Sequence, residues 1–274
     1  LYSSDDGASW SSGTTTETNP YYHGVANGDN VFVAVGNVNI LRSTDNGSNW
    51  TTMTTANLRD VGFGNSTFVA CGADGATYTS ANGSSWTSGT PATSNLLNGI
   101  TFGNNIFIAV GASGTLIKST DNGSSFAVGN SQVSTNLYSI AYGNSIFVAV
   151  GDNGNIFKTI DGGNNWIDLG SQSIYIMNDV AFVNDTLVVS VGAYGSYLFS
   201  TNTGESWTYK NTNSSETFFA IEKKNSTTAY IVGTHGAFRE FSESNLSLST
   251  VSTIDVEENW LRDVHCIHQE DSTT

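Results

Sequence analysis

Residues 137–166 read LYSIAYGNSIFVAVGDNGNIFKTIDGGNNW, and residues 97–126 (LNGITFGNNIFIAVGASGTLIKSTDNGSSF) align with them without a gap. Each copy ends in a short box of the form Ser-x-Asp-x-Gly-x-x-Trp. The aromatic residue that closes the box recurs at Trp10, Trp50, Trp86, Phe126, Trp166 and Trp207. This spacing of about 40 residues is typical of a four-stranded propeller blade.

Apolar segments and turns alternate within residues 137–166. Residues 146–150 (IFVAV) are β-branched and aromatic, as a strand buried on both faces requires. Residues 137–142 and 156–159 flank this run, and turns rich in Gly and Asn separate the three because these residues accept positive φ. No window shows a sustained helical period with caps. The unit is therefore predicted to be an antiparallel sheet whose fourth strand starts at Trp166.

The repeat predicts a single all-β domain over residues 1–274, a seven-bladed β-propeller. Seven units of about 40 residues need about 280. Residues 261–274 open a seventh unit, whereas residues 1–10 supply the end of a third strand and the start of a fourth. Pairing the termini would close the ring and remove exposed sheet edges. About ten residues of a second strand would be absent, so that blade has three strands or the natural chain is longer.

Composition excludes several classes of partner. The net charge of −15 argues against nucleic-acid binding and against docking on anionic lipid. No apolar run reaches 18 residues, so no membrane insertion is predicted. With so few arginines in an acidic chain, no basic patch is expected. The chain lacks a starting Met and a visible signal peptide, and is interpreted as processed, excised or part of a longer surface protein.

The box resembles the Asp-box, or BNR, repeat, and the whole chain resembles Asp-box β-propellers, most closely those like the photosystem II assembly factor. The resemblance implies that each box forms the turn between the third and fourth strands at the outer rim. The Asp and Ser would bond the turn backbone, and the aromatic residue would pack between strands. The residues given this structural role are Asp5, Trp10, Asp45, Trp50, Trp86, Asp121, Phe126, Asp161, Trp166 and Trp207. In the two weaker boxes, Ala81 and Asn202 take the Asp place.

The enzymes among these relatives carry features that this chain lacks. Sialidases resembling it use three arginines and an F-R-I-P segment, which is absent here. Xyloglucan-cleaving relatives place two propellers across a cleft, and one propeller cannot form that cleft. A sialidase or a two-propeller glycosidase is therefore not favoured.

Positions that vary between units are where a specific function is expected. The first strand of each unit would line the central channel, and its second and third positions vary most. The predicted ligand-binding residues of this ring are His23, Arg59, Asn98, Tyr138, Asn178, Phe219, Arg262, Asp60, Asp179 and Asp263. Aromatic faces beside amides and carboxylates suit sugars or peptides in a concave site. The alternative is a solvated channel lining with no ligand.

No catalytic residues are assigned. A glycosidase needs two carboxylates roughly 5–10 Å apart, and Asp60, Asp179 and Asp263 are the candidates on different blades. His265, Cys266 and His268 resemble metal spacing, but alternation places His265 on the opposite strand face and a structural zinc takes four ligands. The box turns are a weak candidate for calcium, because they lack the six or more oxygens that one loop would need to supply. No cofactor or metal is predicted.

Cysteine usage gives little information about function. Cys71 falls in the second strand of its unit, and Cys266 falls in a first strand. Both are interpreted as small buried hydrophobic residues.

The predicted function is a non-catalytic extracellular or cell-surface binding propeller that recognises a glycan or a protein. One alternative is a glycoside hydrolase of the Asp-box type. The other is a scaffold like the photosystem assembly factor.

Overall fold

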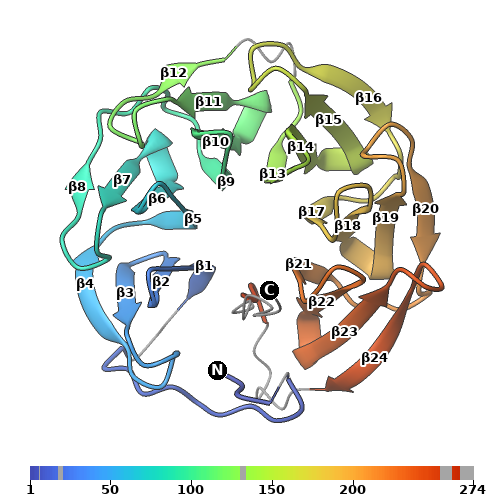
Figure 1. The fold of residues 1–274 in the computed structure, drawn as a ribbon, viewed down its shortest axis with the longest axis horizontal. Helices are drawn as coiled ribbons and strands as arrows, with labels where there is room; N and C mark the ends of the chain where they lie inside the picture. Colours follow the sequence, from blue (N-terminus) through green and yellow to red (C-terminus); the bar gives the residue numbers. More distant parts are fainter. Residues whose placement is uncertain (6, 18–20, 130–133, 254–260, 266–274) are drawn as a thin grey trace, which may run out of the picture.

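A computed structural model describes residues 1–5, 7–17, 21–129, 134–253 and 261–265. Within them, six four-stranded antiparallel sheets are arranged around a common axis, each in chain order from the axis to the rim (Figure 1). We number the sheets 1 to 6 along the sequence. The period predicts seven blades, but the residues near the two termini form no further four-stranded sheet among those described. The predicted all-β class and the four-stranded antiparallel units are confirmed.

The strands follow the predicted units closely. The innermost strands are β1 (Tyr22–Gly28), β5 (Leu58–Gly64), β9 (Leu97–Gly103), β13 (Leu137–Gly143), β17 (Met177–Phe182) and β21 (Phe218–Lys223). The second strands are β2 (Val31–Gly36), β6 (Thr67–Gly72), β10 (Ile106–Gly111), β14 (Ile146–Gly151), β18 (Val188–Gly192) and β22 (Thr228–Gly233).

The outer half of each sheet carries the box. The third strands are β3 (Asn39–Ser43), β7 (Thr77–Ser80), β11 (Leu116–Ser119), β15 (Asn155–Thr159), β19 (Ser196–Ser200) and β23 (Ala237–Ser242). The outermost strands are β4 (Thr51–Thr55), β8 (Thr87–Ser88), β12 (Ala127–Val128), β16 (Ile167–Ser171), β20 (Thr208–Asn211) and β24 (Ser247–Thr253). One-turn 3-10 helices follow the second strand in sheets 2 to 6, namely η1 (Ala73–Gly75), η2 (Ala112–Gly114), η3 (Asp152–Gly154), η4 (Ala193–Gly195) and η5 (Thr234–Gly236).

The hydrophobic core lies between neighbouring sheets. Every residue of β2 is buried, because both faces of this apolar strand meet another sheet or its own neighbours. One apolar cluster joins Val33 and Ile40 of sheet 1 to Leu58 and Phe68 of sheet 2. Similar clusters join the later sheets in pairs. Each sheet therefore depends on its neighbours for burial, as expected for a repeat that cannot cover its own apolar face.

The box is a closed hydrogen-bonded turn. In sheet 3, Asp121 Oδ1 accepts from Ser119 Oγ at 2.6 Å and from the Ser125 amide at 2.9 Å, and Oδ2 accepts from Ser125 Oγ at 2.6 Å. The Gly123 amide donates to Ser119 Oγ. These bonds to the charged form lower the pKa of Asp121 to about 2. The same arrangement surrounds Asp5, Asp45 and Asp161.

The aromatic residue of the box is tied to the same turn. The indole nitrogens of Trp10, Trp50, Trp86 and Trp207 each donate to the carbonyl of the box glycine three residues before. Phe126 and Trp166 pack against the core clusters of sheets 3 and 4.

The box of sheet 2 corrects the sequence alignment. Ala81 does not take the Asp place, because Asn82 Oδ1 accepts from the amides of Ser84 and Ser85. Ser80, rather than Thr79, supplies the hydroxyl that accepts from Gly83. This turn has one residue fewer between serine and glycine than the other boxes. An alignment without gaps therefore assigns the wrong residue to the Asp place. In sheet 5, Asn202 occupies the Asp place as predicted.

Each box packs on the preceding sheet. A Cβ on Gly123 of sheet 3 would meet a methyl of Val69 in sheet 2 at 2.7 Å, and one on Gly163 of sheet 4 would meet Ile108 in sheet 3 at 2.8 Å. A side chain at either glycine is thus excluded by the neighbouring sheet as well as by its positive φ. The box therefore fastens the rim of one sheet to the next.

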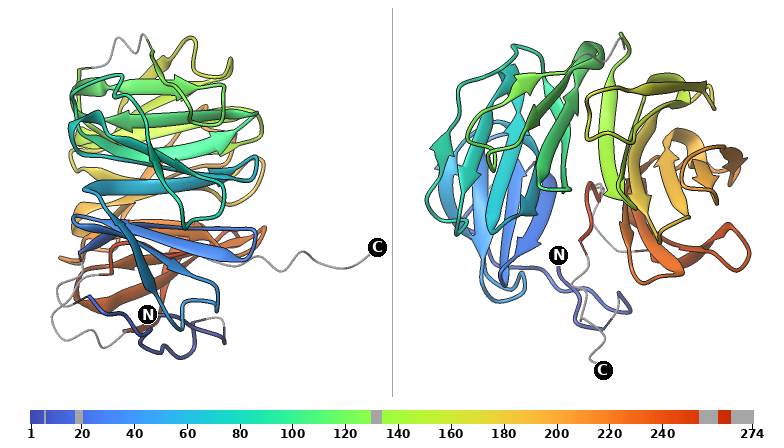
Figure 2. Two further views of the ribbon diagram at one scale, coloured as in Figure 1. Left: turned by 90° about the vertical axis from the view of Figure 1, so that its left-hand side faces the viewer. Right: turned by 45° about the horizontal axis from the view of Figure 1, so that its top comes forward.

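Residues 1–5, 7–11 and 261–265 lie between sheets 6 and 1 (Figures 1 and 2). Trp10 packs edge-on against Phe238 of sheet 6, with ring centroids 5.5 Å apart. The Leu261 amide donates to the Gly233 carbonyl of sheet 6, and the Val25 amide of sheet 1 donates to Asp263 Oδ2. No helix of the described residues is long and apolar enough to cross a membrane.

The box geometry predicts the effect of two substitutions at one position. Asp121→Asn keeps an acceptor for the Ser125 amide, as Asn202 does in sheet 5, and we expect little change in stability. Asp121→Ala removes the acceptors and lowers the free energy of unfolding by about 1–2 kcal/mol. Urea denaturation of both variants checks this, and equal losses would contradict the assigned role of the side-chain oxygen.

Candidate functional site

The second residue of each innermost strand lies at one end of the ring. These residues are His23, Arg59, Asn98, Tyr138, Asn178 and Phe219, and Arg262 holds the corresponding place in residues 261–265. The turns after the second strands reach the same end, since the Tyr138 hydroxyl donates to Asp152 of η3 at 2.9 Å. We call this end of the ring the entry face. The predicted ring positions are thus brought together on one surface.

A cationic cluster occupies one side of the entry face. Arg59 Nη1 lies 2.6 Å from His23 Nε2 and 3.0 Å from Asn37 Oδ1. Burial lowers the pKa of His23, and the positive charges of Arg59 and Arg262 lower it further. The neutral imidazole can accept the guanidinium N–H at Nε2. The expectation of no basic patch is therefore wrong, because the net charge of the protein says nothing of where its few arginines lie.

The Arg59 guanidinium has no carboxylate partner among the described residues. The ion pairs within the described residues include Lys158–Glu205, Lys224–Glu240 and Arg239–Glu216, and none of them involves Arg59. A half-buried guanidinium whose described neighbours are an imidazole and an amide retains donors for an anion. Arg59 is therefore the clearest anion-binding group of the entry face.

The other second-position residues divide into two kinds. Asn98 Nδ2 donates to the Leu137 carbonyl at 2.8 Å, and Asn178 Nδ2 donates to the Phe218 carbonyl at 2.7 Å. Both amides therefore tie one sheet to the next. The Arg262 guanidinium lies over the Phe219 ring, 4.8 Å from its centroid, in a cation–π contact.

The three aspartates of the ring sit in the joints between sheets. Asp60 Oδ1 accepts from the Val61 amide and Oδ2 from the Ile100 amide of sheet 3, both at 2.7 Å. Asp179 likewise accepts from Val180 and, across the joint, from Ile221 at 2.7 Å. Asp263 accepts from Val264 and from Val25 of sheet 1 at 2.7 Å.

The residues beside these aspartates explain the variation at the third position. A Cβ on Gly24 of sheet 1 would lie 2.8 Å from Asp60 Oδ1, so only a residue without a side chain fits there. Ser139 donates its hydroxyl to Asp179 Oδ1. An aspartate in one sheet is thus matched by a small residue in the sheet before it. Comparison of the third positions in consecutive repeats could have revealed this pairing, which was not predicted from the sequence.

Burial sets the protonation of these carboxyls. It raises the pKa of Asp60 to about 7 and that of Asp179 to about 6, although donated amide N–H groups act against it. Burial also raises the pKa of Asp263, and the negative charges of Asp60 and Asp179 raise it further. Both oxygens of each carboxyl already accept a backbone N–H, so the geometry suits a structural joint better than a ligand contact.

Residues predicted for other chemistry lie apart from the entry face or beyond the described residues. Cys71 is fully buried, as predicted, and its thiol is free; burial raises the pKa of this thiol. The described residues contain no group of three His, Cys, Asp or Glu side chains placed to hold a metal ion. Cys266 and His268 lie outside the described residues.

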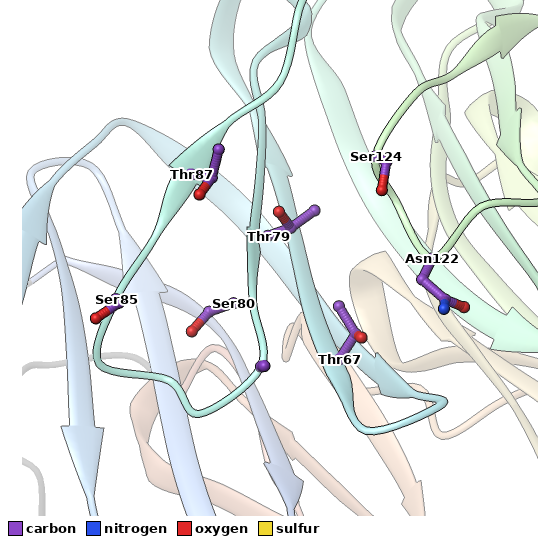
Figure 3. Close-up of a pocket in the computed structure, with 8 residues that line it drawn as sticks. Thr67, Thr79, Ser80, Ser85, Thr87, Asn122 and Ser124 are labelled. Carbon is purple, nitrogen blue, oxygen red and sulfur yellow. The ribbon is translucent and has the colours of Figure 1, made fainter.

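A polar hollow of about 250 Å³ lies on the outer part of sheets 2 and 3 (Figure 3). It is lined by Thr67, Thr79, Ser80, Ala81, Ser85, Thr87, Asn122 and Ser124. None of these lining residues is charged or aromatic. The hollow offers hydroxyl and amide groups but no group that would anchor a ligand strongly.

Comparison with known proteins identifies the fold. No family model and no curated protein matches the sequence. Among solved structures it is similar to YCF48 from Cyanidioschyzon merolae, with TM-score 0.66 and 11% identity over 87% of this chain and 86% of that one. It is also similar to YCF48 bound to D1 peptide, with TM-score 0.65 and 16% identity over 83% and 80% of the two proteins. An ancestral GH74 enzyme gives TM-score 0.63 and 19% identity over 84% of this chain and 37% of the enzyme.

These likenesses define the class of protein. At identities of this size they establish the fold alone, and the protein is a β-propeller built from repeated four-stranded sheets. The predicted propeller fold is confirmed. The similar structures include both an enzyme and a protein bound to a peptide, so the comparison does not decide between catalysis and binding.

The raised pKa of Asp60 predicts an unusual dependence of stability on pH. The unfolded carboxyl has a pKa near 4, so the folded protein binds this proton more tightly. The contribution of Asp60 to the free energy of unfolding is therefore full below about pH 4 and is lost as pH rises to about 7. Asp60→Asn has no proton to lose. We expect the stability of this variant, relative to wild type, to rise by about 3 kcal/mol between pH 4.5 and 7.5.

Urea denaturation at the two pH values measures this difference. Asp29→Asn, in an exposed turn, is the matched control and should keep a constant offset from wild type. A constant offset for Asp60→Asn as well would contradict the raised pKa.

Proposed function

We propose that this protein is a non-catalytic binding propeller whose entry face holds an acidic polypeptide segment of a protein partner. The observation that carries the proposal is the cluster of Arg59, His23 and Arg262 on one face of a protein with net charge −15. A local positive site in an otherwise acidic molecule attracts a carboxylate there and repels it elsewhere. Arg59 presents a planar guanidinium that fits a carboxylate with two parallel bonds.

The aromatic groups beside this cluster favour a segment of polypeptide or a sugar. Phe219 lies under Arg262, and Tyr138 lies further around the same face. A carboxylate bound by Arg59 fits the side group of Asp or Glu, or the carboxyl terminus of a polypeptide. One similar propeller was solved as YCF48 bound to D1 peptide, which supports a peptide as the ligand class. A neutral glycan would leave the cationic cluster unused and is the alternative.

The absence of catalysis is part of the proposal. A glycoside hydrolase needs two carboxyl groups facing one bond. Asp60, Asp179 and Asp263 instead accept backbone amides across the joints between sheets, which supports a structural role. The GH74 neighbour keeps a hydrolase as the alternative from another class. A scaffold like the photosystem assembly factor is a special case of the binding function, with a membrane complex as the partner.

We further propose an extracellular or cell-surface location for this binding module. The support is the composition, with many Asn, Ser and Thr residues, few charges and a strongly acidic balance.

We also infer that residues 1–5, 7–11 and 261–265 occupy the place of a seventh blade and close the ring within one domain. The support is that both segments repeat the contacts of the regular blades. Gly7 packs on Phe238 of sheet 6 as the box glycines of sheets 3 and 4 pack on the sheets before them. Asp263 accepts from Val25 as Asp60 accepts from Ile100. The boxes would then be those of the Asp-box propellers, with residues 3–10 as the box of the shared blade.

Substitution of Arg59 tests the binding proposal. Arg59→Gln removes the charge, and we expect acidic peptides on an array of random 15-residue sequences to bind at least about tenfold more weakly, since a charged hydrogen bond contributes about 1.5–3 kcal/mol. Lys223→Gln, at the opposite end of the innermost strands, is the matched control and should bind as wild type. Wild-type binding should also weaken with added salt.

Three outcomes would contradict the proposal. They are equal binding by Arg59→Gln and wild type, binding confined to a glycan array, and turnover of an arrayed polysaccharide that Asp60→Asn or Asp263→Asn abolishes.

A pair of glycine substitutions tests ring closure. Gly7 has a φ of +79° and its Cβ would meet the Phe238 ring at 2.7 Å, whereas Gly170 has a φ of +74° and open space around it. Gly170→Ala therefore measures the cost of positive φ alone, about 1–2 kcal/mol. Gly7→Ala should cost roughly 1–3 kcal/mol more, because packing is added. Equal losses in thermal unfolding would show that Gly7 is not packed against sheet 6.

A further inference from the structure

An exposed apolar cluster lies on sheet 5 at the entry face. We call Ile174, Tyr175, Ile176 and Tyr194 the sheet-5 cluster. The exposed fractions are 82% for Ile174, 58% for Tyr194 and 38% for Ile176. The rings of Tyr175 and Tyr194 are in contact, with centroids 5.3 Å apart. Surface residues of this size gathered in one place mark an interaction surface more often than residues scattered singly.

Sheets 2, 3, 4 and 6 carry polar residues at the same places. Ile174 lies three residues before Met177, the first residue of β17. The residues three positions before the first residue of β5, β9, β13 and β21 are Thr55, Ser94, Ser134 and Ser215. At the middle of the 3-10 turn, where sheet 5 has Tyr194, the equivalent residues are Asp74, Ser113, Asn153 and His235. The framework of the repeat thus requires no apolar residue at either place.

The backbone at Tyr194 is strained. It has φ 56° and ψ 41°, in the left-handed region. The same conformation at Asp74 or Asn153 is held by residue types that tolerate it, whereas a bulky aromatic residue there is an outlier. Sheet 5 therefore keeps a bulky aromatic residue where its sister sheets keep Asp74, Ser113, Asn153 and His235. Strain of this kind is typical of functional positions.

The sheet-5 cluster is continuous with the cationic cluster. The Ala193 amide of η4 donates to the Ile176 carbonyl, so the two loops that carry the cluster lie against each other. Asn178, two residues after Ile176, donates to the Phe218 carbonyl. The next residue, Phe219, lies against Arg262, whose positive charge acts on both His23 and Arg59. An arc of contacts thus runs along the entry face from Tyr194 to Arg262, and the charge of Arg262 connects this arc to His23 and Arg59.

We infer that the sheet-5 cluster is a second subsite, which binds an apolar side chain of the same acidic segment. This inference rests on the proposed function. The occupant is specified by the two clusters: a carboxylate at Arg59, and an aliphatic or aromatic side chain between the Tyr194 ring and Ile174. A partly exposed pair of aromatic rings flanked by isoleucines offers the broad apolar contact that anchors such side chains.

Selection from a phage library of random 12-residue peptides tests the subsite. Wild-type protein should enrich sequences that combine Asp or Glu with a large apolar residue at a preferred spacing. The double variant Ile174→Ser/Tyr194→Asn gives sheet 5 the residue types found at the equivalent places of its sister sheets. It should keep the acidic preference and lose the apolar one, with selected wild-type peptides binding at least about tenfold more weakly.

Two controls accompany the selection. Val128→Ser removes an equally exposed apolar side chain, 64% exposed on β12, and should select the same peptides as wild type. Thermal unfolding of Tyr194→Asn should give a midpoint about 1–3 °C above wild type, because Asn tolerates the left-handed conformation. A lower midpoint would overturn the claim that Tyr194 is retained at a cost to stability.

The outcomes separate the two proposals. Acidic peptides without an apolar preference would overturn the subsite and leave the proposed function standing. An apolar preference that survives in the double variant would place the apolar contact elsewhere and overturn the subsite. Failure to enrich any acidic sequence on wild type would overturn the proposed function and the inference together.

Discussion

Apolar contact between neighbouring sheets is the constraint on which this structure depends. The second strands are buried on both faces, so no sheet covers its own core, and each one is completed by the sheets beside it. Polar contacts then fix how the sheets meet. At the rim, the box of one sheet lies on the strands of the preceding sheet. Near the axis, Asp60 and Asp179 accept a backbone amide from the next sheet, and the amides of Asn98 and Asn178 donate to its carbonyl groups.

This framework explains which ring residues remain for function. The aspartates and asparagines of the innermost strands are hydrogen-bonded to the next sheet. Some sheets use an aspartate that accepts a backbone amide and some use an asparagine that donates to a backbone carbonyl, which explains why these positions vary. Arg59 differs from these residues, because its Nη1 contacts His23 Nε2 and Asn37 Oδ1 of sheet 1 and its guanidinium keeps further N–H groups that no carboxylate of the described residues accepts. The entry face therefore separates into a polar framework, a cationic cluster and the sheet-5 cluster.

Much of the fold could be predicted from sequence because the repeat is local. The strands, the turns and the box aromatics each follow from a few adjacent residues, and their order repeats about every 40 residues. The short box of sheet 2 could not be aligned correctly. It has one residue fewer between serine and glycine, so Asn82 rather than Ala81 is the counterpart of Asp121 in sheet 3. The partners of Asp60 could not be predicted either. They depend on how two sheets face each other, and neither turn chemistry nor periodicity reports that geometry. The ring positions of Arg59 and Arg262 follow from the repeat, but the contacts of Arg59 with His23 and Asn37 could not be predicted, because net charge averages over the whole sequence and does not report which side chains meet.

The most direct test of the central claim is hydrogen–deuterium exchange of wild-type protein with and without a library-selected acidic peptide. The account predicts slower exchange in the peptide complex at the start of β1 and β5, at residues 261–263 and at η4, with the box turns at the rim unchanged. Protection confined to the outer strands, or to the ends of the innermost strands that carry Lys223, would contradict it.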